Sequence, residues 1–283
     1  LALGKLGDAW VVASETCAFD LIGAEYVRDV EPGEILFITN NGIEEDTFAE
    51  QDKRAMCAME YVYFARPDSN IDGVNVHMAR KRMGKELARE VAGIEADVIT
   101  GVPDSSLSSA IGFAEESGIP YELGLIKNRY VGRTFIQPTQ ELRERGVKMK
   151  LSPVVQVVKG KRVVMVDDSI VRGTTSRRIV RMLKEAGAAE VHVMITSPPM
   201  TNPCFYGIDT STPEQLIASS HSVDEIRQAI EADTLTFLSA EGMVRATARP
   251  FDDPDGGLCM ACFTGKYPTE IFPDTVLPHE KEC

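Results

Sequence analysis

The stretch Val163-Val164-Met165-Val166-Asp167-Asp168-Ser169-Ile170-Val171-Arg172-Gly173-Thr174-Thr175 decides the fold of this chain of 283 residues. Its first four residues are apolar, which is typical of a strand buried on both faces. Two carboxylates follow, and a short loop rich in hydroxyl groups then opens a helix. Ligands of open α/β sheets bind at the carboxyl ends of the strands, and the first backbone amides of a helix can hold a phosphate. The stretch therefore predicts a site for a phosphorylated sugar, with Asp167 and Asp168 beside a phosphate cradle.

An acidic pair also occurs where a strand simply ends in a turn that caps a helix. Here a buried strand precedes Asp167 and Asp168, and Gly173, Thr174 and Thr175 follow just before the expected helix. This combination favours a binding site over a plain turn, because each part has a role in holding a phosphate or a sugar hydroxyl.

Short apolar runs alternate with amphipathic helical stretches on both sides of this motif. The alternation predicts an α/β fold in which helices cover both faces of a mostly parallel, twisted sheet. Ser222 and Glu225 form a capping box that marks the start of one helix. Strands are expected at residues 98–102, 123–126, 154–158, 163–166 and 191–195, and helices at 77–91, 106–117, 174–186 and 222–232.

Two segments depart from this alternation. Residues 1–50 contain several short β-like runs, and residues 44–53 are polar, so we expect residues 1–52 to be the end of a separate β-rich unit and residues 53–283 to form the α/β domain. Residues 127–153 are rich in Lys and Arg and poor in periodic apolar positions. A long loop inside a compact domain is usually functional or disordered, and we interpret this one as a mobile lid.

The composition limits the classes of partner. The chain is 43% hydrophobic and 26% charged, as expected of a globular protein, and its formal net charge is −13. Such a surface repels a phosphate backbone or an anionic membrane, so we expect neither nucleic acid nor membrane as a partner. Leu1 to Trp10 lack the pattern of a secretion signal, and no apolar run is long enough to cross a bilayer, which predicts a cytoplasmic protein.

Residues 163–175 resemble the phosphoribosyl pyrophosphate (PRPP) signature of type I phosphoribosyltransferases. Further segments look like the glutamine PRPP amidotransferase family: EYVYFARPDS at 60–69, GVPDSS at 101–106, KNRYVGRTFIQ at 127–137 and CMACFTGKYP at 259–268. The likeness covers essentially the whole chain and is strongest to the iron–sulfur form of Bacillus-like bacteria. It implies a type I phosphoribosyltransferase fold, preceded by a β-rich remnant of an N-terminal-nucleophile hydrolase (glutaminase) domain.

The resemblance also implies roles for individual residues. Asp167 and Asp168 would serve the ribose hydroxyls and Mg²⁺, with Ser105 as a third position associated with the metal. Lys127, Arg129 and Arg133 would close over the pyrophosphate, although from the residues alone they also fit a solvated charged loop. Contacts to PRPP or to a competing nucleotide are implied at Ser105, Lys127, Ser169, Val171, Arg172, Gly173, Thr174 and Thr175.

Six cysteines are present, and in a chain of this kind thiols or metal ligands are expected more than disulfides. Cys259 and Cys262 form a C-x-x-C pair, which by itself is compatible with zinc, a redox dithiol or an iron–sulfur site. The resemblance implies that Cys57 and Cys204 join this pair as the four thiolates of a structural [4Fe–4S] cluster. Buried small apolar side chains remain the alternative for Cys57 and Cys204.

The implied reaction is displacement of pyrophosphate from PRPP by ammonia, which gives 5-phosphoribosylamine at the first committed step of purine synthesis. In the family, ammonia comes from glutamine in a domain that begins with a nucleophilic cysteine. This chain begins with Leu1, so we expect it to lack most of that domain and to use ammonia instead of glutamine. Inhibition by purine nucleotides and a homotetrameric assembly are implied only by the resemblance.

Two other functions fit the motif. A PRPP-sensing regulator would bind the same ligand without catalysis, but such proteins typically carry a basic DNA-binding module, and none is evident in this acidic sequence. A base-salvage phosphoribosyltransferase would need a nucleobase pocket, but neither the cysteine set nor the segment at residues 60–69. Both fit the sequence less well than the amidotransferase.

Overall fold

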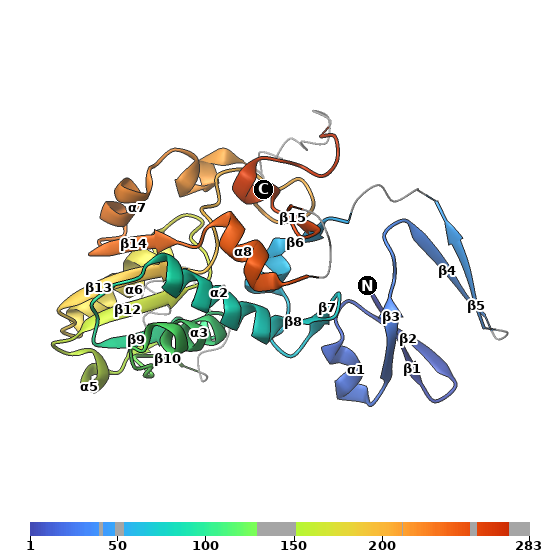
Figure 1. Ribbon diagram of the computed structural model, residues 1–283, viewed down its shortest axis with the longest axis horizontal. Helices are drawn as coiled ribbons and strands as arrows, with labels where there is room; N and C mark the ends of the chain where they lie inside the picture. Colours follow the sequence, from blue (N-terminus) through green and yellow to red (C-terminus); the bar gives the residue numbers. More distant parts are fainter. Residues whose placement is uncertain (40–41, 49–53, 129–150, 211, 250–253, 272–283) are drawn as a thin grey trace, which may run out of the picture.

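The computed structural model describes residues 1–39, 42–48, 54–128, 151–210, 212–249 and 254–271. An α/β body forms the larger part, and a smaller strand-rich unit made by the first residues lies at its side (Figure 1). None of the helices within these described ranges is long and apolar enough to cross a membrane.

A parallel four-stranded sheet forms the centre of the α/β body, with the strand order β14-β13-β12-β9. The motif at residues 163–166 lies in β12, which has two strands on one side and one on the other. The strands predicted at residues 98–102 and 191–195 pair directly with β12. The strand at the other edge was not predicted. The bounds are β9 Val98–Gly101, β12 Arg162–Asp167, β13 Glu190–Ile195 and β14 Thr234–Phe237.

Helices cover both faces of this sheet, as the α/β pattern predicted. Alternate residues of β12 point to opposite faces, so Val164 and Val166 pack with one set of helices and Val163 and Met165 with the other. The first face carries α2 Val76–Glu90, α3 Leu107–Ser117 and α8 Ala240–Thr247, and the second carries α6 Thr174–Glu185 and α7 Val223–Ala229.

Three predicted elements differ in the structure. Residues 154–158 were expected to form a strand, but Val155–Val158 is the short helix α5, in which only Val158 is buried. The strand expected at residues 123–126 is β10 Leu125–Lys127, and it pairs with β11 Leu151–Pro153 outside the central sheet. The helix that starts at the predicted capping box ends at Ala229, earlier than expected.

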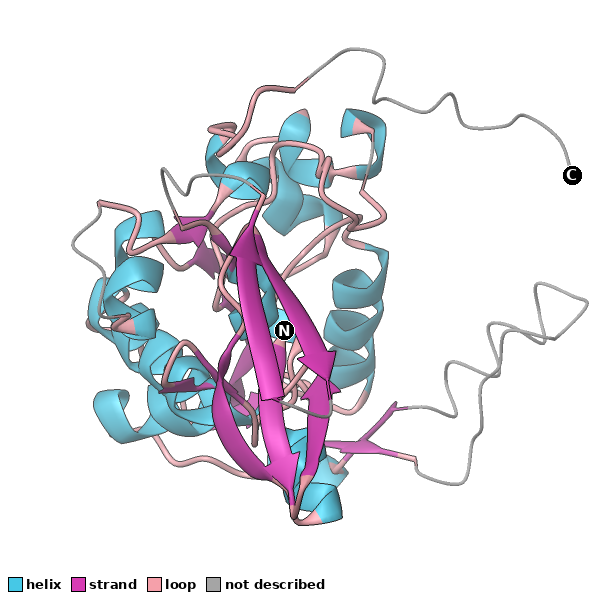
Figure 2. Ribbon diagram, turned by 90° about the vertical axis from the view of Figure 1, so that its right-hand side faces the viewer, coloured by secondary structure: helices cyan, strands magenta, loops and turns pink. Residues whose placement is uncertain are grey.

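The first residues form the expected strand-rich unit. It contains an antiparallel sheet of order β2-β1-β3 and a separate hairpin of β4 and β5. Figure 2 views the molecule from the side of this unit. Part of the segment interpreted as a polar boundary, residues 44–47, belongs to β5. The bounds are β1 Ala2–Leu6, β2 Ala9–Ala13, α1 Cys17–Ile22, β3 Glu25–Asp29, β4 Glu34–Thr39 and β5 Gly42–Thr47.

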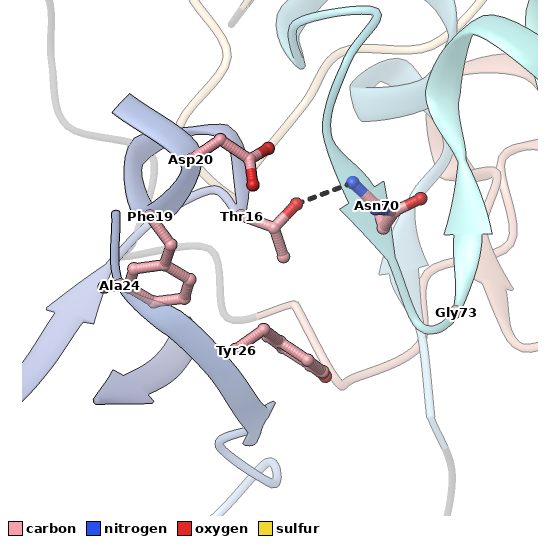
Figure 3. A pocket seen from close by; sticks show the side chains of 7 residues that line it. All are labelled: Thr16, Phe19, Asp20, Ala24, Tyr26, Asn70 and Gly73. Carbon is pink, nitrogen blue, oxygen red and sulfur yellow. Dashed lines mark hydrogen bonds between the residues drawn. The ribbon is translucent and has the colours of Figure 1, made fainter. Parts of the chain in front are cut away.

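Short elements connect this unit to the α/β body. Glu15 accepts hydrogen bonds from the backbone N–H of Arg66 (2.8 Å) and from the hydroxyl of Ser69 (2.7 Å). The Thr16 hydroxyl accepts one from the N–H of Asn70 (2.8 Å), beside a cavity of about 260 Å³ (Figure 3). The connecting elements are β6 Met56–Cys57, the π-helix η1 Glu60–Phe64, β7 Asn70–Ile71, β8 Val74–Asn75, β15 Leu258–Cys259 and α9 Ala261–Thr264.

Candidate functional site

The two carboxylates of the motif lie at the carboxyl end of β12, as predicted. Asp167 and Asp168 are each only 7% exposed. The Asp167 carboxylate accepts hydrogen bonds from the N–H of Asp168 (2.9 Å) and from the hydroxyl of Ser106 (3.0 Å). The Asp168 carboxylate accepts them from the hydroxyls of Ser169 (2.7 Å) and Ser105. The donors fix both side chains in place and partly replace the water that burial removes.

The turn between β9 and α3 brings Ser105 to the carboxylates. β9 runs parallel to β12 and pairs with it directly, so the two strands end at the same edge of the sheet. The residues that follow, 102–106, form a tight turn in which the N–H of Ser106 donates to the carbonyl of Val102 (3.2 Å). The predicted association of Ser105 with the carboxylate pair is therefore a direct contact in the structure.

Burial governs the ionisation of the pair. It raises the pKa of Asp167 well above the ordinary value, and the neighbouring charge of Asp168 raises it further. Burial also raises the pKa of Asp168, while the hydroxyls of Ser105 and Ser169 and the positive charge of Arg80 on α2 act in the opposite direction. Two buried carboxylates side by side attract a cation strongly, because a cation relieves their mutual repulsion.

The loop after the carboxylates leads into α6 through a left-handed residue. Gly173 precedes the helix at φ 75°, and a Cβ there would come within 3.2 Å of the Ile217 side chain. The Val171 carbonyl accepts the N–H of Ile217 (2.8 Å), and the Arg172 guanidinium donates to Gln215 (2.9 Å). Thr174 and Thr175 are exposed at the start of the helix, where backbone amides favour an anion.

Lys127 lies at the end of β10 and approaches the same turn. Its ammonium group forms an ion pair with Asp104 at 2.5 Å, and Asp104 directly precedes Ser105. Lys127 is thus near the site, as the resemblance implied. Arg129 and Arg133, and nearly all of the segment interpreted as a lid, lie outside the described residues.

The four cysteines assigned to a cluster line a second cavity, of about 1100 Å³, between the α/β body and the first residues of the chain. β6 and β15 pair in parallel and place Cys57 opposite Cys259. Cys262 follows in α9, and Cys204 lies in a loop where the N–H of Tyr206 donates to its sulfur (3.4 Å). Segments that are far apart in the sequence therefore each contribute a thiol to the lining of this cavity.

The thiols influence one another electrostatically. Burial, together with the charges of neighbouring thiols, raises the pKa of Cys57 to about 11 and that of Cys262 to about 12. Without a metal, these two thiols therefore stay protonated at neutral pH. Among the residues that the structure describes, no three His, Cys, Asp or Glu side chains are close enough together to hold a single metal ion.

Residues 72–200, which include the turn with Ser105 and the motif on β12, match the phosphoribosyl transferase domain family. The chain contains a phosphoribosyltransferase domain. The family likeness noted from the sequence is also confirmed, because the chain is similar over its whole length to curated amidophosphoribosyltransferases.

The amidophosphoribosyltransferase of Bacillus subtilis is 70% identical over 100% of this chain, which covers 59% of that protein. Those of Staphylococcus epidermidis and Archaeoglobus fulgidus are 54% and 53% identical over 96% of the chain, which covers 55% and 59% of them. A solved structure of glutamine PRPP amidotransferase from B. subtilis, complexed with ADP and GMP, has a TM-score of 0.92 and 70% identity, over 98% of this chain and 61% of that one. The chain thus spans less than two thirds of these relatives.

The phosphoribosyltransferase domain contains site residues that sequence reasoning did not single out. Ser106 holds Asp167, Asp104 holds Lys127, and Thr196 donates its N–H to the Asp167 carbonyl (2.9 Å). Ser106 and Asp104 lie in the segment GVPDSS, which carried part of the family likeness, so the sequence did indicate that this segment belongs to the site. Their individual roles depend on the direction of each side chain, which no pattern of residue types gives.

Proposed function

We propose that the protein is an amidophosphoribosyltransferase that forms 5-phosphoribosylamine and pyrophosphate from PRPP and ammonia. The observation that carries the proposal is the buried pair Asp167 and Asp168 at the carboxyl end of β12, joined by Ser105 from the turn that follows the neighbouring strand. The 70% identity to the B. subtilis enzyme supports the same reaction. The solved B. subtilis relative is named a glutamine PRPP amidotransferase, and we propose glutamine as the physiological source of the ammonia.

Different residues of the phosphoribosyltransferase domain would bind different parts of PRPP. Asp167 and Asp168 would bind the ribose hydroxyls and Mg²⁺, with Ser105 beside them. Oxygen ligands suit this ion, which commonly keeps waters and substrate phosphates in its shell, so few protein ligands are enough. When bound, Mg²⁺ would neutralise charge on the pyrophosphate. The 5-phosphate and the adjacent part of the substrate would be bound by Ser169, Val171, Arg172, Gly173, Thr174 and Thr175.

In the chemical step, opposite charges develop on the leaving pyrophosphate and on the ribose. The bond from C1 of the ribose to the pyrophosphate breaks while ammonia adds, so negative charge grows on the leaving group and positive charge on the ribose. Lys127 would stabilise the leaving pyrophosphate, and Asp167 and Asp168 would stabilise the positive charge that grows on the ribose they bind. The proposed role of Arg133 in covering the pyrophosphate rests on the family resemblance alone.

We also propose that Cys57, Cys204, Cys259 and Cys262 hold a [4Fe–4S] cluster with a structural role. All four thiols line one cavity, and Cys262 lies close enough to the other three to interact with them electrostatically. Four thiolates suit either zinc or an iron–sulfur cluster, and the preference for the cluster rests on the family resemblance. Binding would link β6, β15 and the Cys204 loop.

Nucleotides are proposed as competing ligands of the same site. The B. subtilis relative was solved in complex with ADP and GMP, and a nucleotide phosphate has the charge that Ser105, Lys127 and Ser169 would recognise. Assembly into a homotetramer is proposed from the family resemblance. Both can be measured on the same preparation, by inhibition of turnover and by light scattering.

The test is release of pyrophosphate from PRPP and Mg²⁺, measured with ammonium or glutamine on protein prepared without oxygen. We expect turnover with ammonium, and none with ammonium in an Asp168→Asn variant. Tight PRPP binding without turnover would contradict the enzyme and favour a sensor. Turnover only with a free nucleobase would indicate a salvage phosphoribosyltransferase.

A further inference from the structure

The turn that carries Ser105 makes two contacts with opposite consequences for ligand binding. The Ser105 hydroxyl donates to Asp168 and so supports the carboxylate pair. The residue before it, Asp104, forms the ion pair with Lys127 at 2.5 Å, and the two side chains are 68% and 51% exposed. One tight turn therefore holds both the proposed metal ligand and the cation proposed to bind pyrophosphate.

An ion pair this exposed is easily broken. Exposed ion pairs contribute little to stability, so water and other ions compete with Asp104 for the lysine. An anion that binds beside Lys127 meets a cation whose charge Asp104 already balances. Its binding is therefore weaker until the carboxylate moves away.

We propose that Asp104 is an internal competitor for Lys127, which an incoming pyrophosphate group must displace from the ion pair. The inference rests on the proposed function, because it takes Lys127 to be a pyrophosphate ligand. Asp104 would hold the lysine close to the site in the free protein and would keep weakly charged anions from occupying it. A ligand with several negative charges, such as pyrophosphate or PRPP, gains enough from Lys127 to replace the carboxylate.

The probe is pyrophosphate with Mg²⁺, titrated calorimetrically into the wild type, Asp104→Asn, Lys127→Gln and the double variant. The asparagine is nearly the same size as the aspartate but lacks its charge, so we expect Asp104→Asn to bind about 3- to 10-fold more tightly. Lys127→Gln should bind more weakly. In the Lys127→Gln background the gain from Asp104→Asn should fall to about 2-fold or less, because only the general repulsion remains.

Unchanged or weaker binding by Asp104→Asn would overturn the inference, and so would an equal gain in both backgrounds. Circular dichroism and thermal unfolding check that the variants remain folded, which the exposure of both side chains favours. A folded wild type that binds no pyrophosphate would instead refute the proposed function, and the inference with it. The two failures are thus distinguishable.

Discussion

The proposed function places two opposing requirements on Asp168. It would have to be ionised to bind a cation, yet it is buried beside Asp167, and burial raises the pKa of both carboxyls. An acid with a raised pKa binds its proton more tightly in the folded protein than in the unfolded chain. At a pH above the folded-state pKa, the ionised pair therefore lowers the free energy of unfolding. This loss of stability disappears as the pH falls and the carboxyls become protonated. Binding is favoured here at the expense of stability.

Replacing Asp168 with Asn should raise stability while it removes binding. The amide relieves the repulsion from Asp167, so we expect the free energy of unfolding at neutral pH to rise by on the order of 1 kcal/mol, with a smaller gain at acid pH. Urea denaturation at several pH values measures this. Asp209→Asn, which removes an exposed charge, is the matched control and should change little. A less stable Asp168→Asn would contradict the account.

The carboxylate pair could be predicted because two adjacent acids rarely follow a buried strand and precede a hydroxyl-rich loop unless they bind a ligand. Its supporting contacts could not be predicted. Ser105 and Ser106 are adjacent and chemically identical, and only the geometry of the turn directs one to Asp168 and the other to Asp167. The partner of Lys127 is 23 residues away in the sequence, beyond the reach of any local pattern.

The crossing of α2 and α3 depends on two glycines. A Cβ on Gly84 would lie 1.9 Å from the carbonyl oxygen of Ser109, and one on Gly112 would lie 1.9 Å from that of Lys81. The two backbones are therefore in direct contact. Because α3 follows the turn that holds Ser105, the crossing also fixes that turn relative to the sheet.

Gly84→Ala should separate the helices and cost about 3 kcal/mol in the free energy of unfolding, since a backbone carbonyl cannot move aside as a side chain can. Chemical denaturation provides the measurement. Met78→Ala, on the same helix but 45% exposed, should change stability by only about 0.5 kcal/mol. Equal stability of Gly84→Ala and the wild type would show that the helices do not pack this closely.

Long elements with a clear period were predicted well, and short ones were not. The apolar positions of α6 recur every three or four residues, and Gly118 ends α3 in the left-handed conformation, as expected. Val154 to Val158 reads as a strand because valine favours extended structure. In the structure, however, the N–H groups of Val157 and Val158 bond back to the Val154 carbonyl and so close a helical turn.

The cysteines connect distant parts of the molecule. Cys57 precedes η1, Cys204 follows β13, and Cys259 and Cys262 lie near the end of the described chain, yet all line one cavity. A cluster there would hold the last described segment against the rest of the α/β body. Sequence reasoning proposed this set only through the family resemblance, since C-x-x-C alone fits several metals.

Cys259→Ser should lose most of the bound iron and sulfide and should unfold more readily, because three thiolates hold a cluster poorly and β6 and β15 lose their link. Iron and sulfide analysis of protein purified without oxygen gives the result, with denaturation as a second readout. Cys17→Ser is the control, because Cys17 lies in the strand-rich unit outside the proposed set. Zinc in the wild type, or unchanged iron in Cys259→Ser, would overturn the cluster.

The proposed function requires that the carboxylates, the loop before α6 and Lys127 all bind one ligand. Calorimetric titration of PRPP with and without Mg²⁺ tests this most directly. We expect the wild type and Asp209→Asn to bind PRPP in the presence of Mg²⁺. Asp168→Asn should bind it at least about 100-fold more weakly, because even the loss of a group that only supports a metal ligand costs about 10- to 100-fold in affinity. PRPP binding that survives in Asp168→Asn, or no binding by the folded wild type, would contradict a PRPP site at the end of β12.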